Sequence, residues 1–150
     1  MGMGLRRGMA EDAAAAGTKL KLNFLLPHTA IMKEAMVDMV IVPSSTGSMG
    51  VLPGHVPTVA QMKPGVVSIH NGEEIEKYFV SSGFTFVHGE QTDICAVEAA
   101  KVDDIDPEAV KSGLSQSEND LSSATDDLGR AEAQIGVDVY SAMQAAIETK

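Results

Sequence analysis

Four histidines and a serine pair are the residues of this sequence that could support hydrolytic or metal chemistry. A hydrolase needs a nucleophile, a base and a group that orients the base, and a metal site needs several closely spaced ligands. Ser81 and Ser82 lack the leading glycine of a nucleophile elbow. The histidines have no carboxylate or cysteine at ligand spacing; they are His28, His55, His70 and His88. We therefore expect no catalytic residue, no metal site and no cofactor.

Two further segments have compositions associated with ligand binding. Residues 44–50 read SSTGSMG, but no Lys-Ser or Lys-Thr pair follows, so they do not form a phosphate-binding P-loop. The acidic cluster at 103–108 lacks the glycine and terminal glutamate of a calcium-binding EF-hand loop. Within it, Asp106-Pro107-Glu108 is typical of a helix start, with Asp at the N-cap and Pro at the first helical position. A capped helix explains these acids without a metal.

Composition and charge narrow the possible partners. The 150 residues carry a formal net charge of −10, which disfavours nucleic acids and anionic membrane surfaces. No stretch approaches the roughly 20 apolar residues that span a bilayer, so direct membrane insertion is not expected. The one cysteine, Cys95, lies in an apolar run, where we expect a buried and unreactive thiol.

Residues 19–98 contain apolar runs that are typical of short β-strands. The first run alternates with a period of two and ends before Pro27; its inward face comprises Leu20, Leu22, Phe24 and Leu26. A second strand is expected over 34–42, ending at Pro43, and two more over 84–87 and 93–98.

The pair Asn71-Gly72 lies between apolar runs at 66–70 and 74–80, which is the strongest short signal for a β-hairpin. We expect both residues to have the positive φ angles of a type I′ turn. With the other runs, this predicts a sandwich or barrel over 18–101, preceded by a disordered tail at 1–17.

Residues 102–150 have a helical period instead. One helix is expected from Asp106 to a break at Ser122-Ser123, with an apolar stripe of Val110, Leu114, Ser117 and Leu121. A second is expected from near Thr125, with Asp126 and Asp127 in its first turn. Its stripe comprises Leu128, Ala131, Ile135, Val139, Ala142 and Ala146. The two would pack as an antiparallel hairpin.

Three glycines, Gly113, Gly129 and Gly136, weaken this predicted hairpin, because each costs about 1 kcal/mol relative to alanine inside a helix. The stripes are narrow and rich in small residues, so the two helices alone bury little area. We therefore expect the sandwich or a partner protein to support the hairpin.

The segment 44–58 is unusually rich in residues that shape the backbone, with three glycines and two prolines. An ordered loop on a rigid sheet is a good place for a protein contact. A corner where a strand crosses between two sheets would explain the same composition. Local chemistry leaves both interpretations open.

The pattern G-x-x-G-V-L-P-G-H-x-P followed by K-P-G occupies residues 47–57 and 63–65. It resembles the sandwich domain of the small central-stalk subunits of F-type ATP synthases, which comprise bacterial epsilon and mitochondrial delta. KYFVSSGF, DIDPEAVKSGL and EAQIGVDVYSA also resemble this family, so the similarity covers about residues 19–148. LNFLLP and KYFVSSGF are more similar to the mitochondrial than to the chloroplast form.

The resemblance implies a roughly ten-stranded β-sandwich followed by a C-terminal helical hairpin, with no active site. It implies a rotor part on the matrix side of the mitochondrial inner membrane. There the chain would clamp the gamma subunit to the c ring, coupling proton-driven rotation to ATP synthesis. A small epsilon subunit would pack against the hairpin.

The resemblance also assigns residues. Thr46, Gly47, Ser48 and Met49 would face the polar loops of the c ring. Bacterial relatives often have an acid where this chain has Ser48, so we expect contact through Met49, backbone groups and the glycine-shaped turn. Five residues would shape the loop: Gly50, Pro53, Gly54, His55 and Pro57.

Some bacterial relatives bind ATP on the hairpin through a pattern that Asp127 and Arg130 match in part. Asp126 replaces the leading aliphatic residue of that pattern. We therefore expect an ordinary surface ion pair and no nucleotide site.

The sequence leaves two alternative functions open. In bacterial relatives the hairpin can extend along gamma and inhibit ATP hydrolysis, although three helix glycines and a low basic charge argue against that here. A small-molecule-binding sandwich or hydrolase unrelated to the synthase is the other, and no residue requires it.

Overall fold

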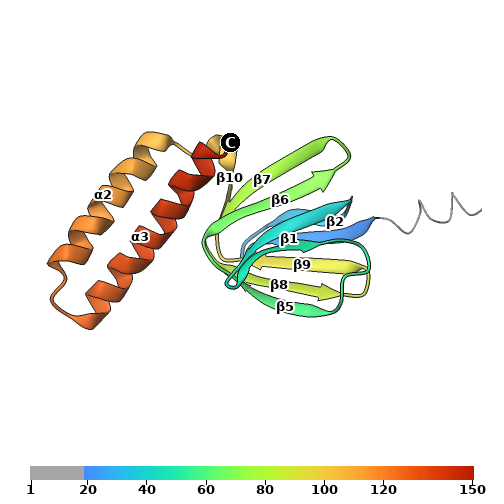
Figure 1. Cartoon of the computed structure of the whole chain (residues 1–150), viewed down its shortest axis with the longest axis horizontal. Helices are drawn as coiled ribbons and strands as arrows, with labels where there is room; N and C mark the ends of the chain where they lie inside the picture. The colour runs from blue at the N-terminus through green and yellow to red at the C-terminus, as the bar shows by residue number, and fades with distance from the viewer. Residues whose placement is uncertain (1–18) are drawn as a thin grey trace, which may run out of the picture.

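A computed structural model describes residues 19–150, in which ten β-strands precede a pair of α-helices (Figure 1). The strands are β1 Leu20–Leu25, β2 Ala30–Val37, β3 Met39–Ser44, β4 Gly47–Val51, β5 Thr58–Met62, β6 Gly65–Asn71, β7 Glu74–Val80, β8 Gly83–His88, β9 Gln91–Ala96 and β10 Ala99–Lys101. A 3-10 turn, η1 Val102–Asp104, leads to helices α2 Pro107–Ser123 and α3 Asp127–Glu148. The predicted sandwich and hairpin are thus confirmed. The tail predicted at 1–17 lies outside the described residues.

The strands form one sheet that folds over on itself. Its order is β10-β7-β6-β3-β5-β8-β9-β1-β2, with β4 paired to β3 off this path. β1 and β9 are parallel, and the other pairs are antiparallel. β3 pairs with β6 near its start but with β5 only at Ser44, opposite Met62. The chain therefore does turn a corner between the two layers at Ser44, immediately before the proposed contact segment.

The core lies between the two layers. Leu20, Leu22 and Phe24 are at most 1% exposed, which confirms the predicted inward face of β1, and Leu26 packs at the margin of the core. The Phe24 ring contacts that of Tyr78 edge-on, with 5.5 Å between their centroids. Within residues 19–150, no helix is apolar over a sufficient length to cross a bilayer.

The single strand predicted over 34–42 is wrong, because the chain bends at Asp38 between β2 and β3. The Asp38 carboxylate accepts a hydrogen bond from the Gly72 backbone N–H and pairs with Lys19 at 2.6 Å. These contacts hold the pKa of Asp38 below its usual value and tie the bend to the β6–β7 turn. Pro43 lies inside β3 rather than ending it, and its carbonyl accepts the Lys63 N–H at 2.9 Å.

The predicted β6–β7 hairpin is present, but its turn type is wrong. Asn71 pairs with Glu74, so the two central turn residues are Gly72 and Glu73. Only Gly72 has a positive φ, of 64°, which is the pattern of a type II′ turn. Asn71 instead stays in the strand, where its side-chain oxygen accepts a hydrogen bond from Lys19.

Both helices begin with an aspartate cap. The Glu108 N–H donates to Asp106 at 3.0 Å and Pro107 occupies the first turn, as predicted. α3 begins two residues later than expected, because Asp126 is its N-cap rather than a first-turn residue and accepts from the Gly129 N–H.

The helix glycines have a steric role that offsets their low helix propensity. A Cβ at Gly113 would collide with the Tyr140 ring, and one at Gly136 would lie 2.6 Å from Ser117 Oγ. The glycines therefore let α2 and α3 approach closely.

The sandwich supports one end of this hairpin. Phe79, Val102 and Ala146 are buried together, and five partly buried residues pack on them: Val66, Ile105, Val139, Ala142 and Met143. Lys77 donates to the Thr149 carbonyl at 3.1 Å, and Lys150 pairs with Asp103 at 2.9 Å. Figure 1 shows α3 between α2 and the sandwich.

Candidate functional site

The structure keeps the histidines on separate parts of the sandwich. Across residues 19–150, no group of three or more His, Cys, Asp or Glu side chains is arranged to hold a metal ion. His28 is exposed, His70 lies half-buried in β6, and His55 bonds through Nδ1 to the neighbouring Val56 carbonyl at 2.8 Å. Among the acidic side chains of residues 19–150, only Asp93 contacts a histidine, since His88 Nε2 lies 2.7 Å from it.

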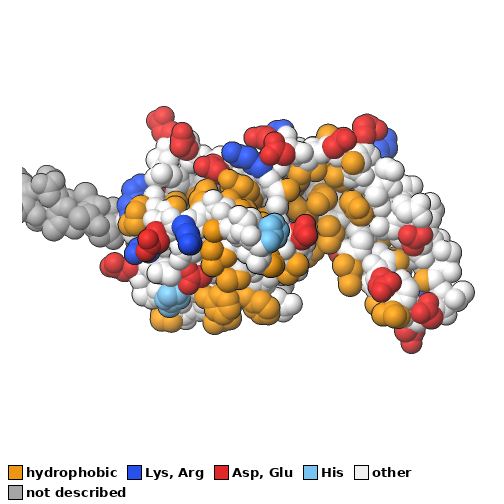
Figure 2. Space-filling model, turned by 180° about the vertical axis from the view of Figure 1, so that it is seen from behind, with side chains coloured by type: hydrophobic (Ala, Val, Ile, Leu, Met, Phe, Trp, Pro, Cys, Tyr) orange, Lys and Arg blue, Asp and Glu red, His pale blue; other side chains and the backbone are white. Residues whose placement is uncertain are grey.

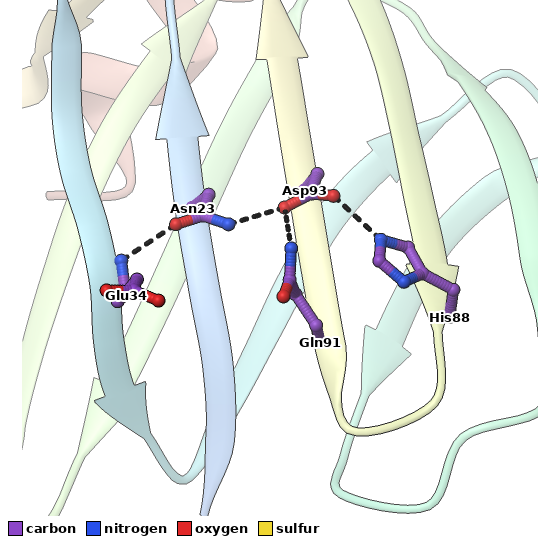
Figure 3. Close-up of polar contacts among 5 residues, drawn as sticks. All are labelled: Asn23, Glu34, His88, Gln91 and Asp93. Carbon is purple, nitrogen blue, oxygen red and sulfur yellow. Dashed lines mark hydrogen bonds and ion pairs between the residues drawn. The ribbon is translucent and has the colours of Figure 1, made fainter.

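Asp93 is the centre of a polar ladder on the solvent face of the sheet (Figure 3). Its carboxylate accepts hydrogen bonds from Asn23 at 2.6 Å and Gln91 at 2.8 Å, besides the contact to His88. Asn23 in turn accepts the Glu34 N–H at 2.7 Å. Glu34 has a φ of 49°, and the β1–β2 register shifts nearby. The ladder therefore joins β2, β1, β9 and β8 and holds a strained bulge, which is a structural role.

The ladder makes stability depend on pH. Partial burial raises the pKa of Asp93, but the hydrogen bonds from Asn23, His88 and Gln91 outweigh it and hold that pKa below its usual value. The unfolded chain therefore binds the proton more readily, so the stabilisation is present above about pH 4 and is lost as pH falls through the lower folded pKa. We expect Asp93→Asn to cost about 1–2 kcal/mol at pH 7.

Urea unfolding of both chains between pH 7 and pH 3 checks this, and the difference should shrink steadily toward acid. Glu73→Gln, which removes an exposed carboxylate in the β6–β7 turn, is the control and should show no such trend. A constant difference between Asp93→Asn and the unmodified chain would contradict the role of the ladder.

The predicted ring-contact residues are not a loop but the end of a hairpin. Thr46 lies in the two-residue turn between β3 and β4, while Gly47, Ser48 and Met49 are strand residues opposite Ser44, Pro43 and Val42. Ser48 is exposed and Met49 packs partly against the core. Ser44 Oγ accepts the Thr46 N–H at 3.4 Å and lies 3.1 Å from its hydroxyl, which fixes the turn.

The predicted loop-shaping residues also divide between strand and turn. Gly50 lies in β4, whereas Pro53, Gly54, His55 and Pro57 lie between β4 and β5. The His55 N–H donates to the Leu52 carbonyl at 3.1 Å, and Gly54 between them has a φ of 82°, which favours glycine. This turn lies beyond Val51, at the other end of β4 from Thr46.

An outer apolar face on β5 and β8 was not found from the sequence. It comprises Val59, Phe84 and Phe86, which are 67%, 48% and 38% exposed. Val59 pairs with Phe86, and the rings of Phe84 and Phe86 lie 6.4 Å apart. Figure 2 shows hydrophobic side chains gathered along the lower side of the sandwich, where Figure 1 draws β5 and β8. A depression of about 460 Å³ adjoins this face and includes Phe84, Cys95 and Val97.

Cys95 is exposed, so the prediction of a buried thiol is wrong. The alternation of β9 places Thr92, Ile94 and Ala96 inward and Cys95 outward. Partial burial, followed by the nearby charge of Asp93, raises the pKa of the Cys95 thiol. The thiol therefore belongs to the rim of the outer apolar face.

The apolar stripe predicted for α3 is only partly correct. Val139, Ala142 and Ala146 pack on the sandwich, but Leu128 and Ile135 on the same helix face are 67% and 63% exposed. The contact with α2 involves other positions, among them Gly136 and Tyr140. The prediction used the whole α3 stripe for packing against α2. In the structure the C-terminal half of this stripe packs on the sandwich, and the N-terminal half is uncovered.

Asp127 and Arg130 lie on the exposed first turn of α3. Among the ion pairs of residues 19–150, none joins these two side chains. The expected surface pair is therefore not formed.

Comparison with known proteins relates this arrangement to one family. The family model described as ATP synthase, Delta/Epsilon chain, beta-sandwich domain matches residues 19–102. Mitochondrial ATP synthase subunit delta' of Ipomoea batatas is 52% identical over 131 residues, covering 87% of this chain and 66% of the relative. The mitochondrial delta subunit of Kluyveromyces lactis is 42% identical, covering 91% and 86%. The chain thus spans about two thirds of the length of the plant relative.

A solved structure has the same fold. A chain in the cryo-EM structure of Euglena gracilis mitochondrial ATP synthase, comprising OSCP, F1 and c-ring, superposes with a TM-score of 0.81. It is 28% identical, and the match covers 87% of this chain and 82% of that one.

Proposed function

This chain belongs to the delta/epsilon family of ATP synthase subunits, and on that premise we propose that it is a non-catalytic rotor part of a mitochondrial ATP synthase. In this role the sandwich holds the gamma subunit and rests on the c ring. Rotation of the ring, driven by protons, then turns gamma and drives ATP synthesis. The chain would lie on the matrix side of the inner membrane, attached through its partner subunits.

The outer apolar face carries this proposal. Val59, Phe84 and Phe86 lie on a rigid antiparallel pair of strands with their side chains in solvent. Burying a large apolar side chain contributes roughly 1.5–3 kcal/mol, so covering this face stabilises a complex substantially. Large exposed apolar patches mark protein interaction sites. We assign this face to the gamma subunit, because a chain that holds gamma during rotation needs a broad and stable contact with it.

The uncovered half of the α3 stripe suits a second partner, the small epsilon subunit. Leu128 and Ile135 continue a stripe that already packs on the sandwich. Between residues 112 and 149 Arg130 is the one cation, against seven acids: Glu118, Asp120, Asp126, Asp127, Glu132, Asp138 and Glu148. A basic segment with an apolar side fits both features. Such a partner would supply support where the sandwich does not reach.

Charged substitutions on the outer apolar face test the assignment of gamma. Val59→Asp and Phe84→Asp place a carboxylate in the proposed contact, and we expect each to reduce co-purification of gamma with the tagged chain by at least about tenfold. Both positions are exposed, so the free chain should remain folded. Ile75→Asp on β7, where Ile75 is 53% exposed, is the matched control and should retain gamma. Normal recovery of gamma with both outer-face variants would refute the assignment.

The regulatory alternative is tested by removing the hairpin. If α2 and α3 inhibit ATP hydrolysis, an enzyme assembled without residues 106–150 hydrolyses ATP faster. If they only support the stalk, the truncated enzyme loses stability or assembly instead.

A further inference from the structure

β4 is an unprotected edge strand. Among the strands of residues 19–150 it pairs with β3 alone, and it lies off the main path of the sheet. Natural edge strands usually carry charges, prolines or bulges that prevent another strand from adding to them. β2 at one end of the sheet carries Lys33, Glu34 and a bulge, and β10 at the other end has three residues and ends in Lys101. β4 reads GSMGV and has none of these features.

The backbone groups of Ser48 and Gly50 point away from β3. In antiparallel pairs, positions that exchange both backbone hydrogen bonds alternate with positions that exchange none. Pro43 has no N–H, so its partner Ser48 is at a position of the second kind, and so is Gly50 two residues further along. The Pro43 carbonyl agrees with this alternation, because it accepts from Lys63 on the opposite side of β3.

The space beside this edge is open. Ser48 and Gly50, the two residues whose backbone groups point outward, are both exposed. The surroundings also lack formal charge, because residues 39–62 contain no Asp, Glu, Lys or Arg. Recognition here must therefore rely on main-chain groups and shape rather than on ion pairs.

We propose that β4 binds the c ring by strand addition, taking up an extended, weakly charged polypeptide segment of the ring. The N–H and C=O groups of Ser48 and Gly50 supply the main-chain hydrogen bonds, as in other cases of β-augmentation. A second copy of this chain is the less suitable occupant, because two chains of net charge −10 repel each other. The inference rests on the proposed function in one respect, that residues 46–49 face a partner.

Proline at position 48 tests strand addition directly. Ser48→Pro removes an outward N–H that β3 does not use, so the β3–β4 pairing is retained. Ser48→Ala removes the hydroxyl and keeps the N–H. In ATP synthase assembled with each full-length chain, we expect Ser48→Pro to weaken attachment to the c ring by at least about tenfold. Ser48→Ala should attach normally, and both variants should retain gamma and melt near the unmodified chain.

Hydrogen exchange of the unmodified chain gives an independent readout. The Ser48 and Gly50 amides should exchange rapidly in the free chain and become protected in the assembled enzyme. Normal ring attachment with Ser48→Pro, or equal loss with both variants, overturns strand addition, and so does fast exchange after assembly. A free chain that sediments as a dimer, and as a monomer with Ser48→Pro, would identify a second copy as the occupant and overturn it too. Loss of gamma in Val59→Asp tests the proposed function separately.

Discussion

Replacing Gly83 with alanine is expected to destabilise the sandwich by more than about 3 kcal/mol. Gly83 begins β8 with a φ of 147°, a backbone conformation that residues with a side chain rarely adopt. A Cβ there would collide with the Cys95 carbonyl and lie 2.8 Å from the Ala96 Cα. Both atoms belong to the backbone of β9, so neither can move aside without breaking the β8–β9 pairing. The urea midpoint of the free chain should fall accordingly.

Gly89→Ala tests how much of the stability loss in Gly83→Ala comes from the steric overlap with β9. Gly89, in the β8–β9 turn, also has a positive φ, of 59°, but a Cβ there would meet nothing within 4 Å. It should cost only about 1–2 kcal/mol, the cost of a left-handed φ without a steric overlap. Equal losses for the two variants would show that the close approach of Gly83 to β9 is unimportant.

Phe79→Ala is expected to cost about 3–5 kcal/mol and to detach the helical hairpin. Phe79 is 2% exposed and lies between the sandwich and α3, against Val102 and Ala146. Its removal leaves a cavity at the one region where the hairpin is seated, so α3 should lose hydrogen-exchange protection before the strands do. Proteolysis at the linker after η1 should also accelerate.

Phe84→Ala is the matched control, because it deletes the same atoms from a side chain that is 48% exposed. In the free chain it should cost less than about 1 kcal/mol. Intact protection of α3 in Phe79→Ala would mean that contacts other than Phe79 hold the hairpin.

The spacing of the apolar residues and the helix-capping residues were sufficient to predict most of the secondary structure. The alternation from Leu20 to Phe24 marked a half-buried strand, and Asp106-Pro107 marked the start of α2. The errors arose where distant contacts overrode local signals. Asp38 bends the chain because it accepts a hydrogen bond from Gly72, and Asn71 stays in its strand, where it accepts a hydrogen bond from Lys19. Neither partner can be identified from the neighbouring sequence.

The candidate surfaces were harder to predict, because a period of two defines two faces of a strand but not which one is buried. β8 turns Phe84 and Phe86 outward and Thr85 inward, which is opposite to ordinary hydrophobic preference. The fully buried Thr85 and Thr92 hydroxyls have no hydrogen-bond partner within the described residues 19–150. The apolar stripe of α3 was visible from the sequence. How much of this stripe the sandwich covers depends on how far the helical hairpin extends beyond the sandwich. The roles of Thr46 to Met49 remain predictions.

The parallel pairing of β1 with β9 has a consequence for how the chain reaches its native state. Asn23 and Asp93, which lie side by side in this pair, are 70 positions apart in the chain. Pairings of such separation form slowly, whereas a local helix pair such as α2–α3 can form within microseconds. A nascent chain that ends before β9 therefore leaves β1 and β8 without the strand that separates them. Such a chain exposes unpaired strand edges that promote aggregation. Chaperone protection therefore matters most before residue 96 has been synthesised.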